Sequence, residues 1–175
     1  MKRLIIILLS FISISLSSAQ NKRSAVDSIL FEKINEYREE NCLNRLTWCD
    51  SAYKTSLHHT RYLANNHKIS HDRPDEDFLV RFEMFGIDSY YQGENLMYVN
   101  YYNTPTDDSL AVFILEGWKN SPTHNELLLE PIILKGAIGH AGTGKFSHYT
   151  MTEYGDIYFM TEFKNYYWFT LEVYN

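Results

Sequence analysis

Three polar residues in the middle of the chain, His71, Glu94 and His124, are of the types that bind metal ions or transfer protons. Two neutral imidazoles and one carboxylate match the three protein ligands of a zinc site that keeps its fourth position open. Such a site could polarise a water molecule or hold the metal for a bound ligand. The three residue types therefore predict a small metal site.

The same residues also fit plainer roles. Glu94 could hydrogen-bond one imidazole and raise its basicity, which would give a general base. Glu94 could instead accept backbone N–H groups in a glycine-containing turn, with the two histidines as hydrogen-bonded side chains at loop junctions. No Ser or Cys is placed as a nucleophile by the sequence pattern. Residue types alone leave the metal, acid–base and structural roles open.

The stretch 107–129 has to position His124. Its pattern predicts a helix that breaks at Ser121-Pro122 and a short second helix that restarts with Ser121 as its N-cap. A proline cannot continue a helix, but it suits the first turn of a new one. His124 then lies near the start of the second helix, which the apolar residues 127–129 anchor to the core.

The other elements follow from apolar periodicity. Helical spacing over 24–40 and 50–66 predicts two amphipathic helices, and 75–85 predicts a shorter one with Phe78, Leu79 and Phe82 inward. His71 then lies in a loop, and Glu94 leads into a strand through Tyr102. Later the period changes to two over 134–141, 146–153 and 157–164, with glycine-containing turns between, which predicts an antiparallel meander. Helices first and strands later predict an α+β domain.

Residues 1–20 read as a signal peptide. Lys2 and Arg3 precede an apolar run, and small residues follow at 17–19. The run is shorter than the about 20 residues that a membrane-spanning helix needs, so an uncleaved anchor helix is the less favoured alternative. We expect a single domain over 21–175, exported as a secreted or periplasmic protein without a membrane span.

The net charge restricts the classes of possible partner, and the two cysteines bear on disulfide formation. Without Lys2 and Arg3, the 16 basic residues become 14 against 22 acidic ones, a net charge of −8. This acidity argues against nucleic acid or an anionic membrane surface as a partner. Cys42 and Cys49 predict one disulfide in an oxidising compartment, with two free thiols as the alternative.

Several short motifs, taken together, resemble the CAP superfamily, which comprises cysteine-rich secretory proteins, antigen-5 venom proteins and plant pathogenesis-related proteins, and especially its short bacterial members. The motifs are, in order, Ser70-His71, Gly93-Glu94-Asn95-Leu96, Trp118-x-x-Ser121-Pro122-x-His124 and Gly136-Ala137-Ile138-Gly139. The resemblance covers essentially all of the mature chain. It implies a three-layer α/β/α sandwich with a central antiparallel sheet and a cleft in which two histidines face two acids.

Carried over residue by residue, the resemblance assigns His71, Glu94 and His124 to this cleft as ligands of a divalent metal such as zinc. The second acid, which many members place just after the helix tryptophan, has no counterpart here, because Trp118 is followed by Lys119. Glu116 or Glu126 could substitute, although neither stands at the family position.

The resemblance implies an exported binding or interaction module without turnover, with a lipid, a sterol or a protein of the host or cell envelope as its partner. The cleft motif without a nucleophile or a second acid favours this reading over an enzyme. The alternative is a metal-assisted hydrolase of the peptidase type that uses the same cleft. A third reading is a structural accessory of the envelope with a vestigial cleft.

Overall fold

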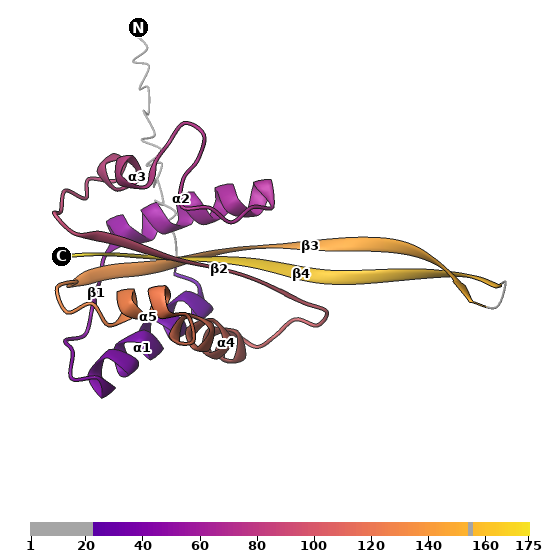
Figure 1. Ribbon diagram of the computed structural model, residues 1–175, viewed down its shortest axis with the longest axis horizontal. Coiled ribbons are helices and arrows are strands. Elements are labelled where there is room, and N and C mark those ends of the chain that lie inside the picture. The colour runs from indigo at the N-terminus through magenta and orange to yellow at the C-terminus, as the bar shows by residue number, and fades with distance from the viewer. Residues whose placement is uncertain (1–22, 154–155) are drawn as a thin grey trace, which may run out of the picture.

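The computed structural model describes residues 23–153 and 156–175. The helices are α1 (Ala25–Glu40), α2 (Asp50–Asn66), α3 (Phe78–Met84), α4 (Asp107–Lys119) and α5 (Pro122–Leu128), and the strands are β1 (Thr47–Trp48), β2 (Gln92–Tyr101), β3 (Lys135–Glu153) and β4 (Asp156–Tyr174). Helices α2 and α3 lie on one face of the sheet and α1, α4 and α5 on the other (Figure 1). This is the predicted α+β fold with three layers. The predicted signal peptide lies outside the described residues.

The sheet is mixed rather than antiparallel throughout. Its strand order is β1-β3-β4-β2, with β4 antiparallel to both neighbours. The short strand β1 pairs in parallel with β3, through Thr47 opposite Lys135 and Trp48 opposite Gly136. The prediction of an antiparallel sheet is wrong at this edge, because a strand of two residues leaves no periodicity in the sequence from which its direction could be read.

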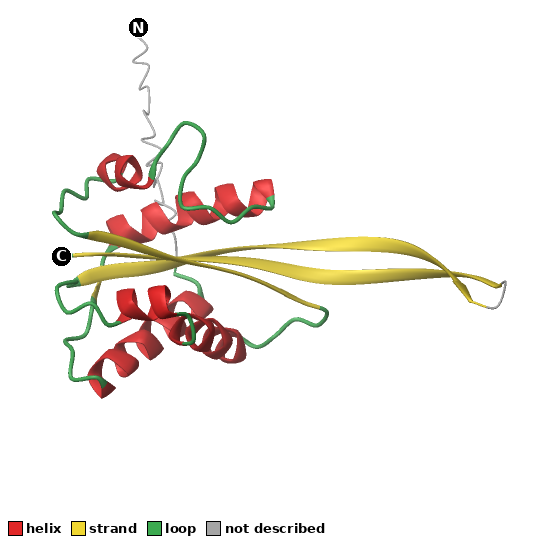
Figure 2. Cartoon of the chain, in the orientation of Figure 1, coloured by secondary structure: helices red, strands yellow, loops and turns green. Residues whose placement is uncertain are grey.

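The predicted meander is replaced by two long strands. β3 and β4 have 19 residues each and stay paired from Lys135–Tyr174 to Glu153–Asp156. The segment 142–144, predicted to be a turn, lies inside β3 opposite 165–167. Glycine is rarer in strands than in turns, but an extended backbone accommodates it. The second predicted turn falls partly on residues 154–155, which lie outside the described residues. Strands β3 and β4 extend beyond the helices (Figure 2).

The helix break at Pro122 is as predicted. α4 ends at Lys119, and Pro122 occupies the first turn of α5, although the Ser121 side chain makes no capping hydrogen bond. Trp118, the last large residue of α4, is completely buried and donates its indole N–H to the Leu96 carbonyl at 3.1 Å. This bond ties α4 to β2, the strand that carries Glu94.

The third helix is shorter than predicted. It begins at Phe78, where Asp77 accepts a hydrogen bond from the Val80 amide at 2.8 Å and so caps the first turn. Phe82 is buried as expected, but Leu79 is 58% exposed, so its predicted inward position is wrong. A helix of seven residues presents few side chains to the core, and the buried ones here are Arg81 and Phe82.

The predicted disulfide is absent, because Cys42 and Cys49 are both free. Cys42 is exposed just beyond α1, in the left-handed region with φ of 59°. Cys49 precedes α2, and its sulfur accepts a hydrogen bond from the Tyr174 hydroxyl at 2.8 Å. Spacing in the sequence could not reveal that the two side chains have different surroundings.

Helix α2 packs closely on the sheet at Gly139. A Cβ atom there would lie 2.7 Å from the backbone nitrogen of Leu57 and 2.8 Å from the Ser56 hydroxyl. Gly117, on α4, differs: its Cβ would meet only the end of the Met97 side chain. The first contact involves rigid backbone and the second a flexible side chain.

We therefore expect Gly139→Ala to lower the free energy of unfolding by about 2 kcal/mol, in the range of overpacked cores. Gly117→Ala should change it by less than about 1 kcal/mol, since Met97 can move and alanine favours a helix. Urea unfolding of both variants measures the difference. Equal effects would contradict close α2–sheet packing as the reason for Gly139.

Candidate functional site

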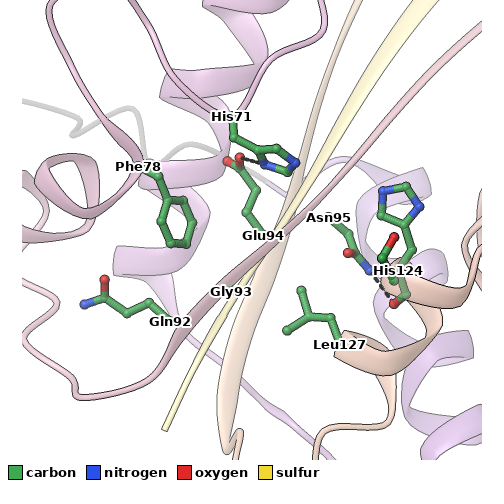
Figure 3. Close-up of a pocket in the computed structure, with 9 residues that line it drawn as sticks. His71, Phe78, Gln92, Gly93, Glu94, Asn95, His124 and Leu127 are labelled. Carbon is green, nitrogen blue, oxygen red and sulfur yellow. Dashed lines mark hydrogen bonds and ion pairs between the residues drawn. The ribbon is translucent and has the colours of Figure 1, made fainter.

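The three predicted residues meet at one cleft, formed by the loop before α3, the start of β2 and the first turn of α5. The cleft has a volume of about 390 Å³, and His71, Glu94 and His124 are among the residues that line it. The rings of His71 and His124 stand on opposite sides of it (Figure 3). Segments far apart in the sequence therefore bring these side chains together.

His71 and Glu94 form a direct pair. The Nδ1 atom of His71 lies 2.7 Å from Oε1 of Glu94. The His71 side chain is 55% exposed, whereas that of Glu94 is 1% exposed, so the carboxylate supports the ring from beneath. The hydrogen bond to Glu94 raises the pKa of His71 above its usual 6.5. It also fixes the ring orientation and leaves Nε2 for the cleft.

The second carboxylate oxygen of Glu94 accepts a hydrogen bond from Arg81. The Arg81 Nη2 atom donates to Oε2 of Glu94 at 2.6 Å, and the guanidinium is completely buried. Burial alone would raise the pKa of Glu94, but the hydrogen bond from His71 and the charge of Arg81 outweigh it, so the pKa lies below its usual value. Glu94 is therefore an ionised carboxylate with both oxygens engaged.

A second acid lies beneath the first. Glu172 of β4 is the cross-strand partner of Glu94, and its Oε1 atom lies 3.4 Å from Arg81 Nε. Complete burial and the charge of Glu94 raise the pKa of Glu172 well above its usual value. The Oε2 atom of Glu172 is buried without a hydrogen-bond partner among the described residues. Burial and the adjacent negative charge of Glu94 therefore favour the neutral form of Glu172.

Glu172 is a second acid at this site that the sequence did not predict. Glu116 is exposed and pairs with Lys119 at 2.6 Å, and Glu126 is also exposed, so neither candidate substitute lines the cleft. The available signal was a charged residue between Leu171 and Val173 in an apolar strand.

His59 completes the buried cluster. Its Nδ1 accepts a hydrogen bond from Arg81 Nη1 at 3.0 Å, which assigns the ring proton to Nε2, and that atom donates to the Ser70 carbonyl at 2.8 Å. Burial lowers the pKa of His59 to about 4. His59 is thus neutral, and it fixes the loop residue that precedes His71.

His124 is held through its main chain, whereas His71 is held through its ring. Its main-chain oxygen accepts a hydrogen bond from the Asn95 side chain at 2.9 Å, which holds α5 against β2. Its Nδ1 has no hydrogen-bond partner among the described residues. Burial, and then the charge of His71, lower the pKa of His124. The cleft therefore presents a readily protonated imidazole opposite a neutral one.

The donor set fits a metal ion only in part. In the residues that the structure describes, no group of three or more His, Cys, Asp or Glu side chains is arranged to hold a metal. Both Glu94 oxygens already have partners, so Glu94 orients His71 rather than offering a free ligand. The imidazoles of His71 and His124 remain as the protein donors, which suits an ion that keeps water or a bound ligand in its other positions.

The chain is similar to a known family in sequence and to known structures in fold. Residues 31–161 match the family model described as the cysteine-rich secretory protein family, CAP. Comparison with curated protein sequences gives no significant match.

Three solved structures share the fold. An extracellular protein of Bacillus anthracis with an SCP domain has a TM-score of 0.59 and 19% identity, covering 86% of this chain and 40% of its own. An outer surface protein of Borrelia burgdorferi has a TM-score of 0.57 and 19% identity, covering 86% and 93%. A cysteine-rich secretory protein of Staphylococcus aureus has a TM-score of 0.52 and 12% identity, covering 89% and 40%. This chain thus spans less than half of two of these proteins.

The two buried acids should respond differently to neutral replacement. Glu94→Gln removes the nearest counter-charge of the buried Arg81, at 2.6 Å, so we expect the free energy of unfolding at pH 7 to fall by about 3 kcal/mol. Glu172→Gln replaces an acid whose pKa is raised well above its usual value, so a protonated Glu172 predicts a change in stability of less than about 1 kcal/mol. Urea unfolding of both variants tests the protonation assignment, which a severe loss in Glu172→Gln would contradict.

His59 should contribute a defined pH dependence. Its pKa is lowered from 6.5 to about 4, so between these values the unfolded chain binds a proton that the folded protein does not. Stability from this group is present above pH 6.5 and is lost as the pH falls towards 4. By linkage, the stability advantage of the wild type over His59→Gln should shrink by about 3 kcal/mol from pH 7 to pH 4. A constant difference across that range would show that His59 titrates normally.

Proposed function

The chain belongs to the cysteine-rich secretory protein family, CAP, and we propose that it is an exported binding module whose cleft holds a divalent metal ion, such as zinc, at His71 and His124. The observation that carries the proposal is the 2.7 Å contact between His71 Nδ1 and Glu94. A carboxylate that fixes one nitrogen of an imidazole orients the other as a metal ligand and raises its basicity.

Each residue of the cluster has a task in this proposal. Arg81 keeps Glu94 ionised, so that Glu94 continues to hold the His71 ring. Asn95 holds the first turn of α5 and with it His124. The bound ion would supply a positive centre for an anionic or carbonyl-bearing ligand. Phe78 and Leu127 line the same cleft and offer apolar contacts to a lipid or a protein side chain.

Binding is favoured over turnover by the chemistry of the cleft. In the described part of the chain, its lining contains neither Ser nor Cys. A metal-assisted hydrolase would need a free carboxylate to activate water, but both oxygens of Glu94 are engaged and Glu172 is completely buried beneath the cleft. These contacts support a module rather than a peptidase.

Export is supported by independent features. Residues 1–20 have the pattern of a signal peptide. Two of the similar structures are an extracellular protein and an outer surface protein. None of the helices in the described ranges is long and apolar enough to cross a membrane.

Zinc titration by calorimetry tests the cleft. The mature protein should bind one equivalent, and His71→Ala/His124→Ala should lose it, while the control His58→Ala/His67→Ala, outside the cleft, should retain it. Glu94→Gln should bind zinc about 10- to 100-fold more weakly, because its carboxylate no longer orients His71.

Two results would contradict the proposal. Zinc bound equally by wild type and His71→Ala/His124→Ala would place the metal elsewhere. Hydrolysis of a peptide substrate by the purified protein, abolished in the same variant, would make the cleft an active site instead of a binding site.

A further inference from the structure

A second cavity lies away from the cleft and shares no lining residue with it. Its volume is about 380 Å³, within the range of about 300–1,000 Å³ that is typical of small-molecule sites. It forms where α2 ends at Asn66 and leaves the sheet uncovered. Its walls are the segment 67–69 on one side and three aromatic residues of β2 and β4 on the other, namely Tyr98, Tyr166 and Trp168.

The aromatic wall is an ordered group of rings. Tyr98 and Trp168 are cross-strand partners with ring centroids 5.0 Å apart. Tyr166 stacks beside both, at 18° to Tyr98 and 28° to Trp168. Trp168 is 2% exposed and donates its indole N–H to the Lys68 carbonyl at 2.9 Å, so it is fixed in place. Tyr98, at 38% exposed, presents its ring to an incoming molecule.

The polar groups at the rim of the cavity include two tyrosine hydroxyls and the ammonium of Lys68. In the described residues, the hydroxyls of Tyr98 and Tyr166 make no hydrogen bond, and the Lys68 ammonium makes neither a hydrogen bond nor an ion pair. His67 contributes an imidazole whose ring centroid lies 5.7 Å from that of Trp168. An unpaired cation beside exposed aromatic faces, in a chain of net charge −6, is a local feature that favours an anionic ligand.

We propose that this cavity binds an acidic saccharide, with the apolar face of a sugar ring against Tyr98 and Tyr166 and the sugar carboxylate at Lys68. Sugar rings combine a C–H face with hydroxyls, and the cavity combines ring faces with hydroxyl groups. The ammonium of Lys68 adds a charge-assisted hydrogen bond to the carboxylate.

Other ligands fit the cavity less well. A lipid chain would bury the two tyrosine hydroxyls and Lys68 without partners, which costs free energy for each group. A single-stranded nucleic acid could stack on the rings, but its phosphates need an extended basic groove, and the chain as a whole is acidic. An acidic saccharide can contact the tyrosine rings with its C–H face and Lys68 with its carboxylate.

Binding of defined oligosaccharides to the mature protein tests the proposal, measured by calorimetry and by tryptophan fluorescence. The acidic probes are tetramers of galacturonic acid and mannuronic acid, and sialyllactose. The matched neutral probe is the methyl ester of the galacturonate tetramer, which keeps the ring shape but removes the charge. At least one acidic probe should bind, and at least tenfold more tightly than its neutral counterpart, with affinity falling as salt rises.

Point variants locate the site. Tyr98→Ala should weaken binding at least tenfold, Lys68→Ala should reduce it to the level of the neutral probe, and Lys68→Arg should restore most of it. Tyr90→Ala, which removes an 83% exposed tyrosine outside the cavity, should have no effect. Far-UV circular dichroism and the melting temperature would confirm that each variant folds.

Several outcomes would overturn the proposal. They are no binding of any acidic probe, equal binding of the methyl ester, unchanged affinity in Tyr98→Ala, or preference for a single-stranded oligonucleotide or a fatty acid. Loss of saccharide binding in His71→Ala/His124→Ala would move the ligand to the cleft. Because zinc titration does not involve Tyr98 or Lys68, failure of one proposal leaves the other intact.

Discussion

The buried guanidinium of Arg81 is the interaction on which the rest of the site depends. It lies between Glu94 and Glu172, donates to His59 and reaches the main-chain oxygen of His71 at 3.2 Å. A charge completely removed from water is tolerable only where each of its donors finds an acceptor. Arg81 comes from α3 and its acceptors from α2, β2, β4 and the preceding loop, so one side chain holds four segments in register.

This arrangement also explains why two acids can be adjacent in the same sheet face. Arg81 compensates the charge of Glu94, and the raised pKa of Glu172 disfavours a second negative charge beside it. Glu76, whose Oε1 atom lies 3.7 Å from Arg81 Nη1, is a further carboxylate at the edge of the cluster. His71, at the exposed end of the cluster, has its pKa raised by the hydrogen bond to Glu94.

The sequence predicted the parts of the site that depend on local geometry. A proline cannot continue α4 but suits the first turn of a new helix, so the place of His124 in the first turn of α5 was predictable. The place of Glu172 was not predictable: the apolar residues around it indicate a buried strand, but not that this strand pairs with one about 80 residues earlier in the chain. The long strand β3 was divided in the prediction, because Gly142 and Gly144 are typical of turns when their strand partners are unknown.

Two consecutive residues of β2 set the width of the cleft. Asn95 holds α5 through the His124 carbonyl at 2.9 Å, and Leu96 holds α4 through the Trp118 indole at 3.1 Å. Glu94, the residue before them, holds His71 on the opposite wall. Both walls are therefore fastened to one short piece of rigid strand, and their separation is fixed before any ligand arrives. A molecule that bridges the two walls does not have to order them, so this preorganisation lowers the entropic cost of association and favours ligands of one size.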